Sequence, residues 1–130
     1  MFESTIGLVD IGDTRQDSSS GAILLLNFVD VVCRHRLALT LRECRYKVFA
    51  PEDNGRSLSE IRDEECEAAD FVIFDLSNIN HDIWLQLRRI CRLRKRDGRP
   101  VLVVCWSRVY RGSEFQLLVE GLGARLLYAK

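Results

Sequence analysis

Asp75 directly follows four large apolar residues, Phe71 to Phe74, and its carboxylate is a leading candidate for chemistry in this chain. Four such residues in a row are long enough for a strand buried on both faces and too short for a helix. The carboxyl end of a central parallel strand is where open α/β sheets bind their ligands. Asp75 is therefore a candidate site residue. The alternative is that it only caps the helix or turn that follows.

Other polar side chains follow other expected strands, and the carboxyl ends of parallel strands share one edge of a sheet. Pro51, Glu52 and Asp53 are expected at this edge after the second strand. The further candidate ligand-binding residues there are Asp10, Gly12, Asp13, Ser77, Asn80 and Ser107. This acidic set favours a cation, a ribose or a protonatable substrate over a bare phosphate. A strand-end carboxylate can also accept hydrogen bonds from ribose hydroxyls.

The elements that must position these residues alternate between strands and helices. We expect strands at 5–11, 45–50, 71–74, 100–105 and 124–128. We expect helices at 22–42, from Ser57 onward, at 82–96 and at 114–120. The apolar residues of 22–42 recur at helical intervals, although this helix could break near 33–37. Ser57 and Glu60 have the spacing of a capping box, and 12–21 is either a plain loop or one that cradles phosphate.

This alternation predicts one α/β domain over residues 1–130, built as a three-layer sandwich. Its sheet should have five mostly parallel strands joined by right-handed crossovers, in a flavodoxin-like or Rossmann-like arrangement. A chain of 130 residues is large enough for a single core.

The amino-acid composition bears on which classes of partner and cofactor to expect. Nineteen basic residues balance nineteen acidic ones, so the net charge does not indicate nucleic acid or membrane as a partner. The longest apolar run is too short and too polar to span a bilayer, and no signal peptide is apparent. Five widely spaced cysteines without a Cys-x-x-Cys pair favour reduced thiols in a cytoplasmic protein, with no metal centre and no cofactor expected.

Seven basic residues crowd the segment from Arg88 to Arg99, most of them on the expected helix 82–96. A basic helix can bind phosphates, but no aromatic residues are interleaved with these charges as nucleic-acid binding would favour. We therefore expect a solvated face, balanced by the acidic segment Asp63 to Glu67 either within one molecule or across an oligomer interface.

The segment from Ala69 to Leu87 resembles the nucleoside 2-deoxyribosyltransferase and TIR-like nucleotide-binding group. The shared pattern is Ala-Asp, then Ile, then Asp-Leu-Ser, then Asn, which this chain supplies between Ala69 and Asn80. Flanking segments 41–51 and 98–102 also resemble that group, so the likeness covers about half the chain. It implies a pocket for a nucleotide or nucleoside.

The sequence differs from that group at two positions on the helix that carries the catalytic residue of the transferases. The transferases place a nucleophilic glutamate on the helix after the strand, and this chain has Gln86 there, with Arg88 in place of a glycine. An amide is not a nucleophile, although it can hydrogen-bond to a sugar hydroxyl. The resemblance therefore implies binding without glycosyl transfer, and Gln86 joins the candidate ligand-binding residues. A structural remnant is the other interpretation.

The chain also resembles, less closely, a phosphoacceptor receiver domain in degenerate form, a pseudo-receiver. That resemblance implies Asp75 as acceptor, Asp10 and Asp13 as the metal-binding pair, Ser107 as switch hydroxyl and Lys130 as the lysine after the last strand. Only in this interpretation would Asp10, Asp13 and Asp75 hold a metal. It implies a signalling or protein-interaction module, with a protein partner or a second copy of the chain.

Two features depart from the receiver pattern. Cys105 and Trp106 stand between the apolar run 101–104 of the expected strand and Ser107, whereas the hydroxyl should follow its strand directly. The connection after the expected first strand is also longer than the pattern requires. The deoxyribosyltransferase-like interpretation therefore ranks first from the sequence.

Overall fold

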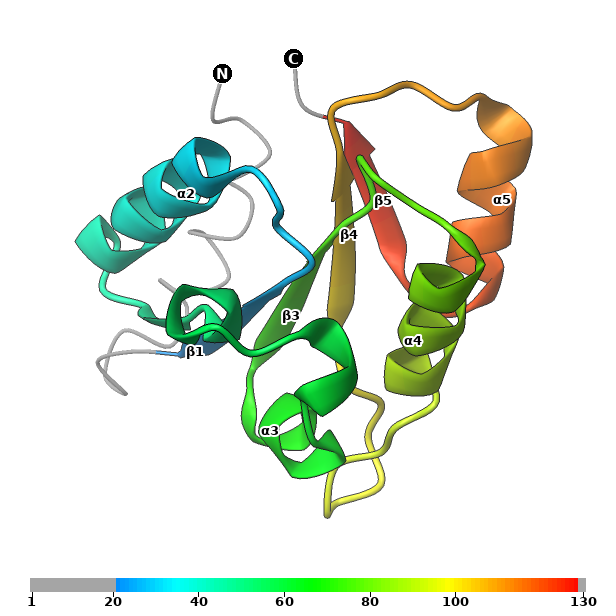
Figure 1. Cartoon of the computed structure of the whole chain (residues 1–130). Helices are drawn as coiled ribbons and strands as arrows, with labels where there is room; N and C mark the ends of the chain where they lie inside the picture. Colours follow the sequence, from blue (N-terminus) through cyan, green and yellow to red (C-terminus); the bar gives the residue numbers. More distant parts are fainter. Residues whose placement is uncertain (1–20, 129–130) are drawn as a thin grey trace.

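The computed structural model describes residues 21–128, and its five strands form one parallel sheet in the order β2-β1-β3-β4-β5 (Figure 1). The strands are β1 (Ala22–Leu26), β2 (Lys47–Phe49), β3 (Phe71–Asp75), β4 (Val103–Ser107) and β5 (Arg125–Tyr128). This is the flavodoxin-like order, in which the chain reverses its direction of progress between β1 and β3. The predicted α/β fold class is confirmed.

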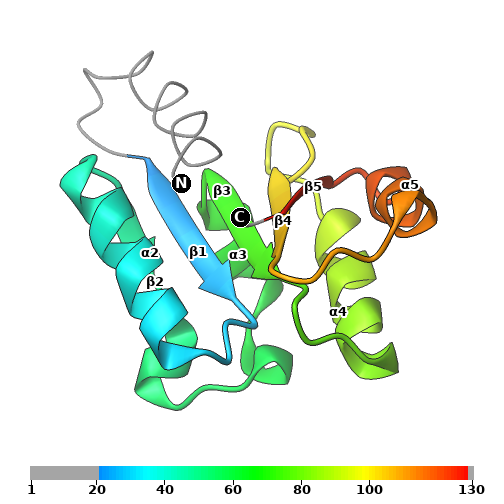
Figure 2. The same ribbon diagram turned by 90° about the horizontal axis from the view of Figure 1, so that it is seen from above.

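Helices cover both faces of the sheet, as Figure 2 shows from above. The helices are α2 (Val31–Glu43), α3 (Asp63–Ala68), α4 (His81–Cys91) and α5 (Ser113–Gly121), with two 3-10 turns, η2 (Pro51–Asn54) and η3 (Leu58–Glu60), between β2 and α3. Helix α2 packs on one face, and α3, α4 and α5 lie on the other. The described elements therefore make three layers.

The core divides into two clusters because successive residues of a strand point to opposite faces. In β3, Val72 and Phe74 pack with α3, α4 and α5, whereas Phe71 and Ile73 pack with α2. All five residues of β3 are buried. The continuous apolar run before Asp75 is therefore the central strand that its pattern predicts.

The expected helix 22–42 is wrong over 22–30, because Ala22–Leu26 is strand β1 and helix α2 begins only at Val31. A short, fully buried apolar run has no polar face, so periodicity does not separate a central strand from a buried helix. Asn27 then adopts a left-handed backbone (φ 65°), and Asp30 caps α2 by accepting the Cys33 N–H at 3.0 Å. The helix begins there.

Two other helix predictions need correction. The expected helix 82–96 is shorter, since it starts after Asn80 and ends at Cys91, so several residues of the basic segment lie on a loop. The Ser57–Glu60 motif closes a 3-10 turn rather than a long helix, with the Ser57 N–H donating to Glu60 Oε1 at 2.6 Å. The expected strand 5–11 lies outside the described residues, and β1 occupies the central position beside β3.

Two further observations concern the described residues. All five cysteines are free thiols, and Cys66 and Cys105 are buried in the core. Between residues 21 and 128, no helix has both the length and the apolar character needed to cross a membrane.

A pair of leucine variants tests the placement of β1 and α2. Leu25 in β1 is fully buried, whereas Leu39 on α2 is 59% exposed. We expect Leu25→Ala to lower the free energy of unfolding by about 2–5 kcal/mol, because it leaves a cavity in the core. Leu39→Ala should change it by about 0.5 kcal/mol or less. Urea unfolding followed by circular dichroism measures both, and equal effects would contradict this placement.

Candidate functional site

The candidate site lies at the carboxyl edge of the sheet, between β1 and β3, where the strand order reverses. Open α/β sheets bind ligands in the crevice at such a switch point. The register pairs Leu26 with Phe74, so the next residues of the two strands, Asn27 and Asp75, lie side by side. These two residues form the centre of the edge.

Asp75 is 4% exposed, and its carboxylate is held by its own loop. Its Oδ1 accepts the Ser77 N–H at 2.8 Å, which is a local turn of the kind that Asp side chains favour. Burial raises the pKa of Asp75, and the bond from Ser77 opposes this shift. The predicted strand-end carboxylate therefore also closes a turn. This is the local capping role that the sequence offered as the alternative to a ligand site.

Asn27 joins the two strands across the switch point. Its Nδ2 donates to the backbone oxygen of Asp75 at 2.9 Å and to that of Asn78 at 3.3 Å. The side chain is 7% exposed, so both bonds are shielded from water. Both carbonyls need a donor, and a carboxylate at position 27 would offer none at neutral pH.

The loop after β4 closes the same edge from the other side. Arg108 donates from its backbone N–H to Ser77 Oγ at 2.9 Å, and its guanidinium forms an ion pair with Asp30 Oδ2 at 3.0 Å. Arg111 donates to the backbone oxygen of Ser77 at 2.8 Å. Its guanidinium also lies 5.7 Å from the ring centre of Phe115. Loops from β1, β3 and β4 are thereby connected.

The β2 side of the edge is tied to the backbone of Phe28. Glu52 Oε1 accepts the Phe28 N–H at 3.2 Å, and Arg34 donates to the Phe28 carbonyl at 2.5 Å. Arg34, which is 7% exposed, also binds Asp53 Oδ1 at 2.7 Å. Burial raises the pKa of Glu52, whereas hydrogen bonds and charge from Arg34 lower that of Asp53 despite its partial burial. Glu52 and Asp53 do reach the edge predicted for them.

Ser107 and Asn80 have local roles. Ser107 is fully buried at the end of β4, and its hydroxyl donates to the Val109 carbonyl at 2.7 Å and accepts the Val109 N–H at 3.0 Å. Because β4 extends through Ser107, the hydroxyl does stand at the end of its strand. Asn80 caps α4 by accepting the Ile83 N–H at 2.8 Å.

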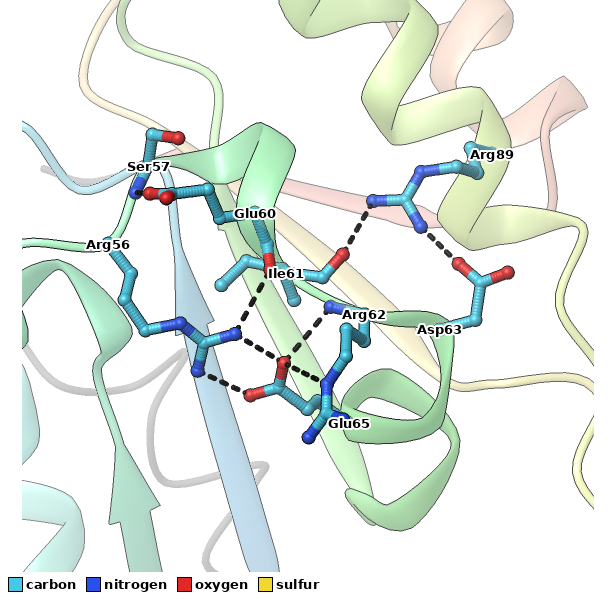
Figure 3. A network of polar contacts seen from close by, with 8 residues as sticks. All are labelled: Arg56, Ser57, Glu60, Ile61, Arg62, Asp63, Glu65 and Arg89. Carbon is cyan, nitrogen blue, oxygen red and sulfur yellow. Dashed lines mark hydrogen bonds and ion pairs between the residues drawn. The ribbon is translucent and has the colours of Figure 1, made fainter.

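Gln86 belongs to a different network, between α3 and α4. Its Oε1 accepts a hydrogen bond from Arg89 Nε at 3.0 Å. The Arg89 guanidinium also forms an ion pair with Asp63 and donates to the Ile61 carbonyl at 3.4 Å (Figure 3). The expected balance between the basic and acidic segments is therefore present at this pair. The contacts of Gln86 do not bring it to Asp75.

Four predicted site residues, Asp10, Gly12, Asp13 and Lys130, lie outside the described residues. Within 21–128, no three His, Cys, Asp or Glu side chains are grouped closely enough to hold a metal ion. The residues that follow β1 at the switch point are Asn27 and Phe28 rather than a pair of acids.

The sequence prediction missed the polar ties made by Asn27, Asp30, Arg34, Arg108 and Arg111. A polar residue that directly follows an apolar run of five was the available signal for Asn27. The helix expected over 22–42 hides this signal, because it places Asn27 inside a helix rather than at the end of a strand. The arginine contacts join loops far apart in the sequence, and no local pattern indicates them.

Comparison with known proteins finds a solved structure with a similar fold but no matching protein family. No protein-family model matches the chain, and no curated protein matches it. A solved structure from Burkholderia pseudomallei K96243, of a protein provisionally named as pilus assembly-related, is similar in fold, with a TM-score of 0.58. The two share 17% sequence identity over 82% of this chain and 76% of that one. At that identity the likeness supports the fold alone.

The buried carboxylate of Asp75 makes stability depend on pH in a defined direction. Burial raises its pKa in the folded state above the ordinary value of 3.8, so ionisation at neutral pH destabilises the fold and protonation removes that cost. We expect Asp75→Asn to melt at the same or a higher temperature than the parent at pH 7. The advantage should vanish below about pH 4. Thermal unfolding between pH 3 and pH 7 measures it.

Asp97→Asn is the matched control. Asp97 is exposed, and the Arg99 N–H and guanidinium lower its pKa, so its ionised form favours the fold at neutral pH. This variant should be equal to or less stable than the parent at pH 7. A loss of melting temperature in Asp75→Asn as large as that of a core variant would contradict the account of Asp75.

Asn27→Asp tests the tie across the switch point. The change keeps the shape of the side chain and its tolerance of a left-handed backbone, but it removes the donor for two carbonyls. We expect a loss of about 1–3 kcal/mol in the free energy of unfolding at pH 7. Asn78→Asp, on an exposed side chain three residues beyond Asp75, should be nearly neutral. Equal effects in urea unfolding would show that the tie contributes nothing.

Proposed function

We propose that this chain is a receiver-like protein-interaction module that works without phosphoryl transfer. The observation that carries the proposal is the pair at the switch point, where Asp75 ends β3 and Asn27 takes the adjacent place at the end of β1. The resemblance to receivers assigns Asp75 to the acceptor position and requires acidic metal ligands beside it. An amide that donates to the backbone of Asp75 takes that place here.

The sequence alone ranks the deoxyribosyltransferase-like interpretation first, but details of the structure favour the receiver-like interpretation. Strand β4 includes Cys105 and Trp106 and ends at Ser107, which removes one departure from the receiver pattern. Strand β1 starts at Ala22, so the connection from its end to α2 is short. The strand order is also one that places a ligand crevice between β1 and β3.

The residues at the edge do not fit the magnesium ion that a working receiver would hold. Magnesium prefers carboxylate and water oxygens in octahedral geometry, and Asn27 and Phe28 supply no carboxylate after β1. The Ser107 hydroxyl is engaged by Val109 on its own turn. The Asp30–Arg108 ion pair further connects the loops that follow β1 and β4.

A protein partner fits the surface beside this edge. Tyr110 is 72% exposed, and Leu117 and Leu118 on α5 are 68% and 60% exposed. Contiguous exposed apolar side chains mark surfaces that contact another protein, and we propose that these three side chains belong to such a surface. Binding of a nucleotide or nucleoside stays a prediction of the deoxyribosyltransferase-like resemblance, which the contacts of Gln86 do not favour.

Treatment with a small phosphodonor tests the proposal. The parent protein is incubated with acetyl phosphate and magnesium chloride, and its intact mass is compared with that of Asp75→Asn. We expect neither protein to gain a phosphoryl group, because the described edge has no acidic pair to hold magnesium. A stoichiometric gain in the parent that Asp75→Asn abolishes would overturn the proposal, and a functional receiver serves as positive control for the donor.

A further inference from the structure

A cavity of about 450 Å³ opens at the β2 edge of the sheet, over the face that carries α3, and Arg42 of α2 also lines it. Its floor includes Ala22, Leu24 and Phe49, and its wall includes Ala68 and Ala69 of the α3 end. Ligand sites in proteins have volumes of about 300–1,000 Å³ and mostly apolar walls. The cavity does not use Asp75 or any residue proposed above for the receiver-like function.

The cavity exists because the connection from β2 to β3 contains only short helical segments. It consists of two 3-10 turns and the six-residue α3, so no long helix covers the edge of the sheet at β2. The register places Leu24 beside Phe49, with both side chains on this face. Leu24 is 3% exposed, but Phe49 is 54% exposed, which leaves an aromatic ring at the opening.

The charged side chains around the cavity are almost all paired. Arg56 forms two hydrogen bonds with Glu65, at 2.7 and 2.5 Å, and this pair lowers the pKa of Glu65 to about 2 (Figure 3). Asp53 is bound by Arg34 and by His35. These charges largely cancel one another.

Among the described charged residues that line the cavity, Arg42 is the one that no opposite charge pairs with. Its Nη2 donates to the Val48 carbonyl at 3.1 Å, and none of the carboxylates in residues 21–128 pairs with it. The guanidinium carries five N–H donors in a planar fork, so most remain for an anion. The uncompensated charge at this cavity is therefore positive.

The hydrogen bond from Arg42 to the Val48 carbonyl disfavours binding of a peptide as an additional strand at the edge of the sheet. Strand β2 is an edge strand of three residues, and an added strand would need its outward backbone groups. The Val48 carbonyl already accepts from Arg42. A compact ligand that enters the cavity needs no backbone pairing.

We propose that this cavity binds a small aromatic organic anion. The aromatic body would lie against Leu24 and Phe49, and the carboxylate or sulfonate would bind the guanidinium of Arg42. Apolar burial and aromatic packing supply affinity for the body. A charge-assisted bond to arginine fixes the orientation and selects the anion over a neutral molecule of the same shape.

The fluorescent probe anilinonaphthalene sulfonate, an aromatic body with one sulfonate, tests the proposal on the full chain. Native protein should bind it saturably at one site. Arg42→Gln keeps N–H donors on a shorter side chain but removes the charge, and we expect it to weaken binding about tenfold. Arg36→Gln, an exposed arginine on the same helix outside the cavity, should leave the affinity unchanged.

A second variant keeps the test valid if Arg42→Gln unfolds. Ala68 is exposed on α3 and lines the cavity, so Ala68→Trp should fill the space and abolish probe binding while thermal unfolding stays cooperative. Benzoate should displace the probe, whereas benzyl alcohol at the same concentration should not. Affinity that none of the cavity variants changes, or equal displacement by the acid and the alcohol, would overturn the proposal. Either result leaves the receiver-like function untouched.

Discussion

The hydrogen bonds from the Asn27 amide to the backbone of the Asp75–Asn78 loop are the constraint on which the rest of the carboxyl edge depends. They join β1 to β3 at the point where the strand order reverses, which is where this kind of fold would otherwise leave a crevice. The Phe28 backbone beside Asn27 is held by Glu52 and Arg34. The loops that follow β1, β2 and β3 are therefore joined to one another by hydrogen bonds.

This constraint has consequences for the electrostatics of the edge. Asp75 is buried with no cation among the described residues bonded to its carboxylate, so burial raises its pKa, and the Ser77 hydrogen bonds and the charge of Arg108 offset this shift only in part. Arg108 and Asp30 neutralise each other at the surface of the same edge, where solvent screens the pair. The carboxylate that the sequence singles out is therefore held by a hydrogen bond within its own turn, and the charges of Arg108 and Asp30 beside it offset each other.

The sequence predicts much of the fold because the apolar runs of β3 and β4 and the turn chemistry around them are local signals. It fails at Ala22–Leu26, since a buried run without polar alternation fits a strand and a helix equally well. That single error hid Asn27, because a residue thought to lie inside a helix is not considered as an edge residue. The contacts of Arg108, Arg111 and Gln86 depend on tertiary packing, which no spacing along the chain encodes.

A magnesium titration followed by nuclear magnetic resonance tests the central claim most directly. The side-chain amide of Asn27 and the backbone amide of Ser77 report on both sides of the switch point. If hydrogen bonds replace the metal there, both signals should stay unchanged up to millimolar magnesium chloride, and the Asn27 amide protons should exchange slowly with water. Saturable shifts of both signals would show a metal site at Asp75 and contradict the account.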